Sequence, residues 1–251
     1  METLKIGINW IDDVLSEGLP IKSTTVITGP GGSGKPLIGE IIVSAWLKKG
    51  GSVIFMSLQY PDSKFAKESI KHVTGLDIKQ YEEKIIFIQL DTEIQEYQEI
   101  NERLIRANLI KPEVWEKALN YAASKLSKKD PGILIFCSAL NLLLFSPTYG
   151  DLIFKKIKET IETNTDKTYL ISVSTSAKKD EIEQLEKSAD NLIISRSEKE
   201  PFRLYMKILR LKGVAFNPEE KQVPISPEIL THIKEMADHS RGKVLPAILK
   251  T

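Results

Sequence analysis

The chain has 251 residues, 41% of them hydrophobic, and a formal net charge of +1, which indicates a globular protein without a strongly basic nucleic-acid surface. One cysteine excludes an internal disulfide, and three scattered histidines form no metal-ligand pattern. No apolar run approaches the ~18 residues of a membrane span, and the first residues lack a signal-peptide layout, so we expect a cytoplasmic protein.

Strands alternate with helices along most of the chain. Apolar or β-branched runs predict strands at residues 24–28, 52–58, 85–90, 133–136, 168–173, 192–195 and 203–211. Helical apolar spacing predicts helices at residues 35–49, 63–72, 151–163, 179–188 and 227–237. This alternation predicts an α/β fold with a mostly parallel central sheet and helices on both faces. We expect one domain over residues 1–226, followed by a C-terminal helix and tail at 227–251.

Two segments lie outside this alternation. Residues 91–129 are polar and charged, and their helical spacing falls into two halves, which Lys111-Pro112 separates. Ile100, Leu104 and Ile105 carry the spacing of the first half. Residues 240–251 are expected to form a loose tail. Because neither the charged segment nor the C-terminal helix and tail is needed for a site, we expect contacts with a protein partner there.

Residues 29–36 read Gly-Pro-Gly-Gly-Ser-Gly-Lys-Pro, a phosphate-binding loop that is intact until its last position. In such a loop the backbone at Gly29, Gly31, Gly32, Ser33 and Gly34 closes around phosphate oxygens, and Lys35 reaches the outer phosphates. The last position normally supplies a hydroxyl to Mg²⁺, but Pro36 has neither a hydroxyl nor a backbone N–H. We expect the helix to form, since proline is tolerated in a first turn, and the phosphate cradle to be weakened. The alternative is a tight turn that binds nothing.

A second Mg²⁺ contact is also altered. Proteins with this loop usually carry an Asp at the end of another apolar strand, where it steadies Mg²⁺. Here strand 133–136 is followed by Cys137, and a thiol is a poor partner for Mg²⁺. We interpret Cys137 as a small buried apolar residue, with a redox or catalytic role as the alternative.

Three acidic residues are candidates to replace the missing metal ligands. Asp62 is better explained as a helix cap, Glu40 as part of the solvated face of its helix, and Asp130 as part of a turn.

Several short stretches occur in a characteristic order. Residues 7–15 read Gly-Ile-Asn-Trp-Ile-Asp-Asp-Val-Leu, and a Gly-Leu-Pro turn at 18–20 precedes the strand and glycine loop. Residues 53–61, 136–141 and 188–193 follow, and then Arg210-Leu211-Lys212-Gly213. Over about residues 3–226 this order resembles the KaiC-like branch of the RecA superfamily. The resemblance implies a RecA-like P-loop core that binds ATP with Mg²⁺. It also implies an oligomer in which a Lys-x-Arg pair reaches the nucleotide of the neighbouring subunit.

The chain departs from this pattern at the residues that activate water. Hydrolysing members carry adjacent glutamates where this chain has Gln59 and Tyr60, and glutamine cannot accept the proton of water. Arg210 and Lys212 keep the charges of the Lys-x-Arg pair in swapped order. They therefore predict either a residual phosphate contact between subunits or solvated charges on an exposed strand.

We accordingly expect a catalytically degenerate member with a regulatory or scaffolding role through protein contacts, which binds ATP weakly or not at all. One alternative is a working ATPase whose Mg²⁺ ligands have moved. The other is a RadA-like recombinase paralogue that binds DNA, which the near-neutral charge opposes. Abundant Lys, Glu and Ile with few Cys and Met is compatible with a thermophilic source.

Overall fold

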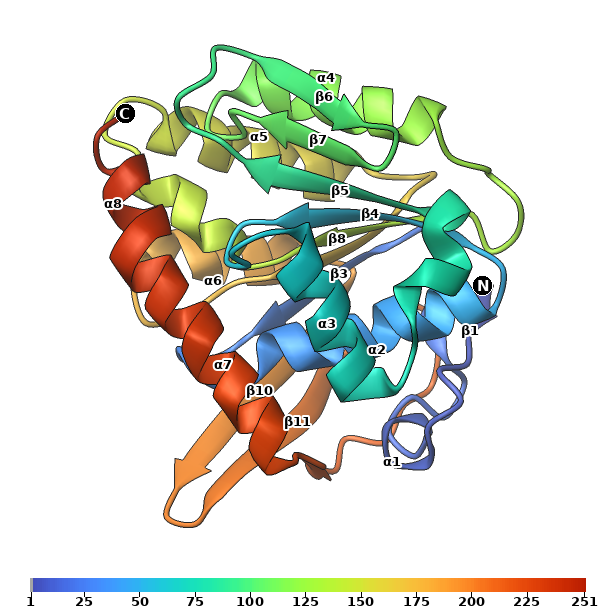
Figure 1. Ribbon diagram of the computed structural model, residues 1–251. Helices are drawn as coiled ribbons and strands as arrows, with labels where there is room; N and C mark the ends of the chain where they lie inside the picture. The colour runs from blue at the N-terminus through green and yellow to red at the C-terminus, as the bar shows by residue number, and fades with distance from the viewer. Residues whose placement is uncertain (1) are drawn as a thin grey trace.

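Ten strands form one sheet at the centre of the molecule (Figure 1). The computed structural model describes residues 2–251, apart from the side chain of residue 57. In the order in which they lie side by side, the strands are β12 (Lys221–Val223), β11 (Phe202–Arg210), β10 (Asn191–Lys199), β3 (Thr24–Thr28), β9 (Thr168–Ser172), β8 (Ile133–Cys137), β4 (Ser52–Ser57), β5 (Ile85–Leu90), β7 (Leu104–Ala107) and β6 (Tyr97–Asn101). Neighbours from β10 to β7 pair in parallel, whereas β11 and β6 pair antiparallel with their neighbours. A separate small sheet pairs β1 (Thr3–Leu4) with β2 (Leu19–Pro20).

Helices cover both faces of the large sheet, which confirms the predicted α/β architecture (Figure 1). The helices are α1 (Asn9–Asp12), α2 (Lys35–Lys48), α3 (Ser63–Thr74), α4 (Pro112–Ser124), α5 (Gly150–Thr163), α6 (Lys179–Ser188), α7 (Pro227–His239) and α8 (Leu245–Ile248), with 3-10 helices at Ile78–Lys84 (η1) and Leu140–Phe145 (η2) and a π-helical turn at Ser240–Val244 (η3). Helices α2, α3 and α7 lie on one face, and α4, α5 and α6 lie on the other. Within the described range, no helix has the length and apolar character needed to cross a membrane.

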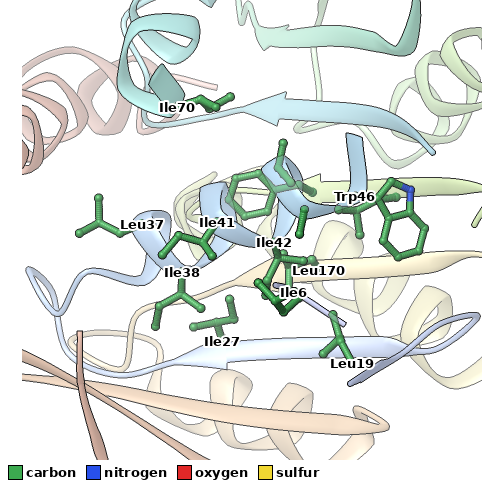
Figure 2. Packing of buried hydrophobic residues seen from close by; sticks show 14 of the residues in the cluster. Ile6, Leu19, Ile27, Leu37, Ile38, Ile41, Ile42, Trp46, Ile70 and Leu170 are labelled. Carbon is green, nitrogen blue, oxygen red and sulfur yellow. The ribbon is translucent and has the colours of Figure 1, made fainter. Parts of the chain in front are cut away.

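Two hydrophobic cores lie on the two faces of the sheet, the first on the face of α2, α3 and α7 and the second on the face of α4, α5 and α6. Helix α2 is the centre of the first core (Figure 2). Every residue from Leu37 to Leu47 is buried, because α2 lies between the sheet and α3. At its C-terminal end, the indole Nε1 of Trp46 donates a hydrogen bond of 3.0 Å to the carbonyl of Gly132, which fixes the helix against the start of β8. A fully buried Ile or Leu side chain stabilises the fold by about 1.5–3 kcal/mol, so this packing holds the N-terminus of α2 firmly beside β3.

The helical prediction for the first half of residues 91–129 is wrong. Strands β6 and β7 form an antiparallel hairpin there, and β7 extends the sheet with Ile105 opposite Ile88. The turn is closed by the Asn101 side chain, which accepts a hydrogen bond of 2.9 Å from the N–H of Arg103. Pairing with β5 buries Ile105 and leaves Ile100 exposed. Strand pairing at the edge of the sheet therefore determines the structure of this segment, and the helical spacing of its apolar residues does not. The second half forms α4, as its spacing predicts.

The prediction of a loose tail at residues 240–251 is also wrong. The chain continues through η3 into α8, and Val244 and Ile248 are buried in the second core. At the end, Thr148 Oγ1 donates a hydrogen bond of 2.9 Å to the carbonyl of Thr251. We call residues 227–251 the C-terminal segment. It packs against α3 at one end and η2 at the other, so it crosses the molecule in front of the carboxyl ends of the parallel strands (Figure 1).

Candidate functional site

The glycine-rich loop connects β3 to α2, and two of its glycines are required by their surroundings. Gly29 has φ +141°, and a Cβ there would overlap the carbonyl oxygen of Ser195 on β10. Gly34 has φ +75°, and a Cβ there would overlap the side chain of Leu204 on β11. Residues with a Cβ rarely adopt such φ angles, so only glycine lets the loop turn this closely beside the β10–β11 hairpin.

Lys35 is buried within its own loop. Its Nζ donates hydrogen bonds to the carbonyls of Gly29 (2.8 Å) and Pro30 (2.6 Å) and to Ser33 Oγ (3.2 Å). An ammonium has three donors, so the loop satisfies all of them. Burial lowers the pKa of Lys35 to about 7. A phosphate group can replace these acceptors only if the lysine side chain moves.

Pro36 does not prevent α2 from forming. The helix begins at Lys35, and Pro36 lies in its first turn, where a missing N–H removes no intrahelical bond. The expectation that the helix survives is therefore confirmed. The position still offers neither the hydroxyl that would hold Mg²⁺ nor an N–H for a phosphate oxygen.

Cys137 ends strand β8 in the second core. Its side chain is fully buried, and burial raises the pKa of the thiol well above its usual range. A buried neutral thiol is a small apolar group and not a nucleophile or a hard-metal ligand. Cys137 thus packs the end of β8 and offers no oxygen at the position where Mg²⁺ needs one.

Tyr60 and Glu40 form a buried pair, which corrects the expectation that Glu40 lies on a solvated helix face. Glu40 is 0% exposed because α3 covers that side of α2. Its Oε1 accepts hydrogen bonds from Tyr60 (2.8 Å) and Ser69 (2.7 Å). Burial raises the pKa of Glu40 to about 7, although both hydrogen bonds oppose this rise. Tyr60 therefore fixes α2 to the end of β4 and does not face the glycine loop.

The other acidic candidates lie elsewhere. Asp62 accepts a hydrogen bond of 2.7 Å from the N–H of Phe65 and caps α3, as predicted. Asp130 precedes β8, at the opposite end of that strand from Cys137. Across residues 2–251, no three or more His, Cys, Asp or Glu side chains are grouped so that they could hold a metal ion.

A cavity of about 580 Å³ opens beside the glycine loop. Polar groups of Gln59, Asn141, Ser172, Ser174 and Ser176, from the carboxyl ends of the strands, line one side. Apolar side chains of η2 and the C-terminal segment close the other side: Leu142, Phe145, Ile233, Met236 and Leu245. Among the described residues that line it, only Lys35 and Arg241 are charged, and both are cations.

Sequence reasoning missed the contribution of the C-terminal segment. The amphipathic pattern of residues 227–237 predicted a helix but not the surface against which its apolar face packs. That surface includes α3, where the ring of His232 contacts Phe65 (ring centroids 5.0 Å apart) and Nε2 of His232 lies 3.1 Å from Nδ1 of His72. This contact holds α7 beside α3, and the C-terminal segment continues from there to Arg241, which lines the cavity beside the glycine loop.

Arg210 and Lys212 do not reach the cavity of their own chain. Arg210 is level with the middle of β3, since it pairs with Leu192, whereas the loop end of β3 pairs with Ile194. Lys212 lies further from the loop, where its N–H donates to Asn191. Arg210 donates hydrogen bonds to the carbonyls of Glu186 and Ala189, and Lys212 forms an ion pair of 2.7 Å with Asp190. A contact between either residue and the phosphates of a neighbouring subunit stays a prediction.

Comparisons with known proteins agree with this architecture. The model of the KaiC family of ATPases matches residues 4–236. A UPF0273 protein of Pyrococcus horikoshii is 28% identical over 88 residues (35% of each chain), and one of Pyrobaculum aerophilum is 32% identical over 82 residues (32% of this chain and 28% of the relative). The matched part thus spans about a third of these relatives. The crystal structure of a KaiC-like protein of Pyrococcus horikoshii has the same fold, with a TM-score of 0.68 at 13% identity over 90% of this chain and 96% of the other.

Proposed function

Because the chain belongs to the KaiC family of ATPases, we propose that it is a regulatory member that binds the phosphate groups of ATP or a similar anion without Mg²⁺ and does not hydrolyse them. The observation that carries this proposal is the charge of the cavity beside the glycine loop. Its lining contains two cations and no carboxylate among the described residues. Anions fit such a site, whereas Mg²⁺ does not find there the carboxylate through which proteins usually bind it.

The chain's own residues supply binding rather than water activation. Backbone N–H groups of the loop and the N-terminus of α2 favour negative charge. Lys35 supplies one positive charge once it leaves its own loop. Gln59 can orient a water molecule but cannot take its proton. The position next to Gln59 holds Tyr60, whose hydroxyl donates to Glu40. Among the described residues that line the cavity there is no carboxylate and no imidazole to serve as a general base, and Lys35 is bound to acceptors of its own loop, which supports binding without turnover.

The alternative of a working ATPase with relocated ligands has little support. Glu40 is committed to a buried network, Asp62 caps α3 and Asp130 lies at the far end of β8. For the DNA-binding alternative, the structure offers no specific observation. A protein partner, and contacts through residues 91–129 or the C-terminal segment, remain predictions from the sequence.

The proposal is tested by titrating ATP in the presence of EDTA and, separately, of Mg²⁺, with calorimetry as the readout and phosphate release measured in parallel. We expect binding that does not require Mg²⁺, no sustained phosphate release, and loss of binding in Lys35→Ala. Sustained release in the wild type that disappears in Lys35→Ala would overturn the proposal.

A second variant tests the role of Pro36. Pro36→Ser restores both a backbone N–H and a hydroxyl in the first turn of α2. One added charge-assisted hydrogen bond is worth about 1.5–3 kcal/mol, so we expect metal-free ATP affinity to rise by roughly ten-fold or more. Calorimetry in EDTA measures this change. An unchanged affinity would contradict the view that Pro36 weakens the cradle.

A further inference from the structure

One wall of the cavity comes from the C-terminal segment, and its charged member is Arg241 in η3. The guanidinium donates hydrogen bonds from Nη2 to Asp238 (3.0 Å) and from Nε to the carbonyl of Ala237 (3.3 Å). An arginine has five N–H donors, so these two bonds leave donors available for a ligand. The side chain is 75% exposed, which leaves it room to move.

Arg241 and Gly32 of the glycine loop line two neighbouring cavities. A second cavity, of about 620 Å³, lies next to the first, and both include Gly32 and Arg241 in their walls. Lys199 from β10 and Lys234 from α7 also line this second cavity, together with the carboxylate of Asp238. The surroundings of Arg241 at the tip of the loop are therefore predominantly cationic.

The charge of a phosphate ligand requires more than Lys35. A terminal phosphate group carries about −1.5 to −2 charges at pH 7, and among the described lining residues no carboxylate is present to hold a compensating divalent ion. A guanidinium matches phosphate oxygens with two parallel N–H donors, which a lysine cannot do. Asp238, the present partner of Arg241, competes only weakly with a phosphate ligand, because an exposed ion pair between neighbouring helical turns contributes little stability.

We propose that Arg241 is a phosphate-contacting residue, supplied by the same chain, that clamps the terminal phosphates of a polyphosphate ligand against Lys35. This inference rests on the proposed function and adds the second cation of the site. On binding, Arg241 exchanges Asp238 for the ligand, so the ligand becomes attached to the C-terminal segment. The polyphosphate could belong to a nucleoside triphosphate or be inorganic, since the contacts recognise phosphate oxygens alone.

The test uses calorimetric titration of the full chain with inorganic tripolyphosphate in EDTA. We expect Arg241→Ala to bind about 10- to 100-fold more weakly, the effect of losing one charge-assisted contact. Arg241→Lys should recover part of the loss, because it keeps the charge without the paired donors. The control is Lys243→Ala, which removes the same charge two residues away. Lys243 lines a different cavity beside Gln89 and Asp91, so we expect affinity within two-fold of the wild type.

A variant that is expected to raise the affinity tests whether the ion pair of Arg241 has a purely structural role. Asp238→Asn removes the carboxylate that holds Arg241, so we expect tripolyphosphate to bind several-fold more tightly, whereas a structural role for the ion pair predicts weaker binding. Melting curves of each variant show that the fold is intact.

The outcomes separate the two proposals. Wild-type affinity in Arg241→Ala, together with lost binding in Lys35→Ala, would overturn the clamp and leave the proposed function standing. Undiminished binding in Lys35→Ala would overturn both. A parallel titration with ATP distinguishes the ligand sources. Tighter binding of ATP than of tripolyphosphate, with the same dependence on Arg241, supports a nucleotide, and equal affinity with that dependence supports an inorganic polyphosphate.

Discussion

Lys35 and Glu40 are both buried in α2, and burial changes their pKa values in opposite directions. The pKa of Lys35 is lowered to about 7 and that of Glu40 is raised to about 7. Each shift disfavours the charged form, because the helix lies between the sheet and α3. The two residues differ in purpose: Lys35 belongs to the phosphate loop, whereas Glu40 joins α2 to Tyr60 and Ser69.

The buried carboxyl of Glu40 predicts a pH-dependent stability. Its folded pKa lies above the unfolded value of 4.5, so its contribution is fully present below pH 4.5 and is lost as pH rises to about 7. At 1.36 kcal/mol per pKa unit, the loss is about 3 kcal/mol. We expect Glu40→Gln to have wild-type stability near pH 4.5 and to be more stable at pH 8. Denaturant unfolding across this range measures the difference.

Two comparisons control this prediction. Glu68→Gln changes an exposed carboxyl on α3 and should leave the profile unchanged. Lys35 contributes in a separate window: the unfolded chain binds more protons between pH 7 and 10.5, so its contribution to stability rises with pH there. Parallel profiles of wild type and Glu40→Gln from pH 4.5 to 8 would contradict the assignment.

At this scale, the sequence identified the residues with altered chemistry but not their surroundings. Pro36, Cys137 and Gln59 are recognisable because they interrupt a pattern with a known physical purpose. The prediction that Glu40 is solvated was wrong because α3 covers this residue. Helix α3 begins more than twenty residues after Glu40 in the sequence. Helical spacing within one element does not contain that information.

Among the elements, α2 and β8 approach each other closely a short distance from the glycine loop. Gly39 faces the ring of Phe136, and a Cβ at Gly39 would overlap that ring. Phe136 cannot readily yield, because it is fully buried and packs edge-on against Phe55 with ring centroids 4.9 Å apart. The distance between α2 and the sheet is therefore set by a glycine.

This contact predicts that Gly39→Ala destabilises the fold even though alanine favours helices. Overpacking a close-packed core typically costs about 1–3 kcal/mol, which exceeds the gain of up to about 1 kcal/mol from helix propensity. The measurement is the free energy of unfolding in denaturant. Gly242→Ala in η3 is the matched control: nothing lies within 4 Å of a Cβ there, so we expect unchanged or slightly raised stability. Equal effects of the two substitutions would refute the contact.

The elements that the sequence predicted well are those with a strong pattern of their own. The parallel strands β4, β5 and β8 are near-continuous apolar runs, as is typical of strands buried on both faces, and β3 is a buried β-branched run. The sequence did not predict the hairpin β6–β7 or the end of the C-terminal segment, because each would be only marginally stable in isolation. Each becomes ordered by a distant surface, the edge of β5 in one case and η2 in the other.

For the whole molecule, the question is whether one chain completes its own site. The C-terminal segment lines one side of the cavity, and Arg210 and Lys212 are held by groups of their own chain. The order of motifs predicted the fold and the phosphate loop. It could not predict this side of the cavity, because the position of a terminal helix depends on packing that follows only after the sheet is assembled.

We therefore expect anion binding to be independent of contacts between subunits. In Arg210→Ala, tripolyphosphate affinity should stay within two-fold of the wild type at every protein concentration. Its stability should fall by about 1–3 kcal/mol, since the Ala189 carbonyl loses its partner. Calorimetry over a series of protein concentrations, with denaturant unfolding, measures both. Affinity that increases with protein concentration and falls in Arg210→Ala would instead support a contact from a neighbouring subunit.

The three hydrogen bonds that hold Lys35 in its own loop have a kinetic consequence. A ligand that reaches the loop meets a lysine whose donors are already occupied, so capture has to wait until the side chain is released. That first step takes place within the protein and does not speed up with ligand concentration. The rate of association should consequently level off as the ligand concentration increases, at the rate with which the Lys35 side chain leaves its own loop.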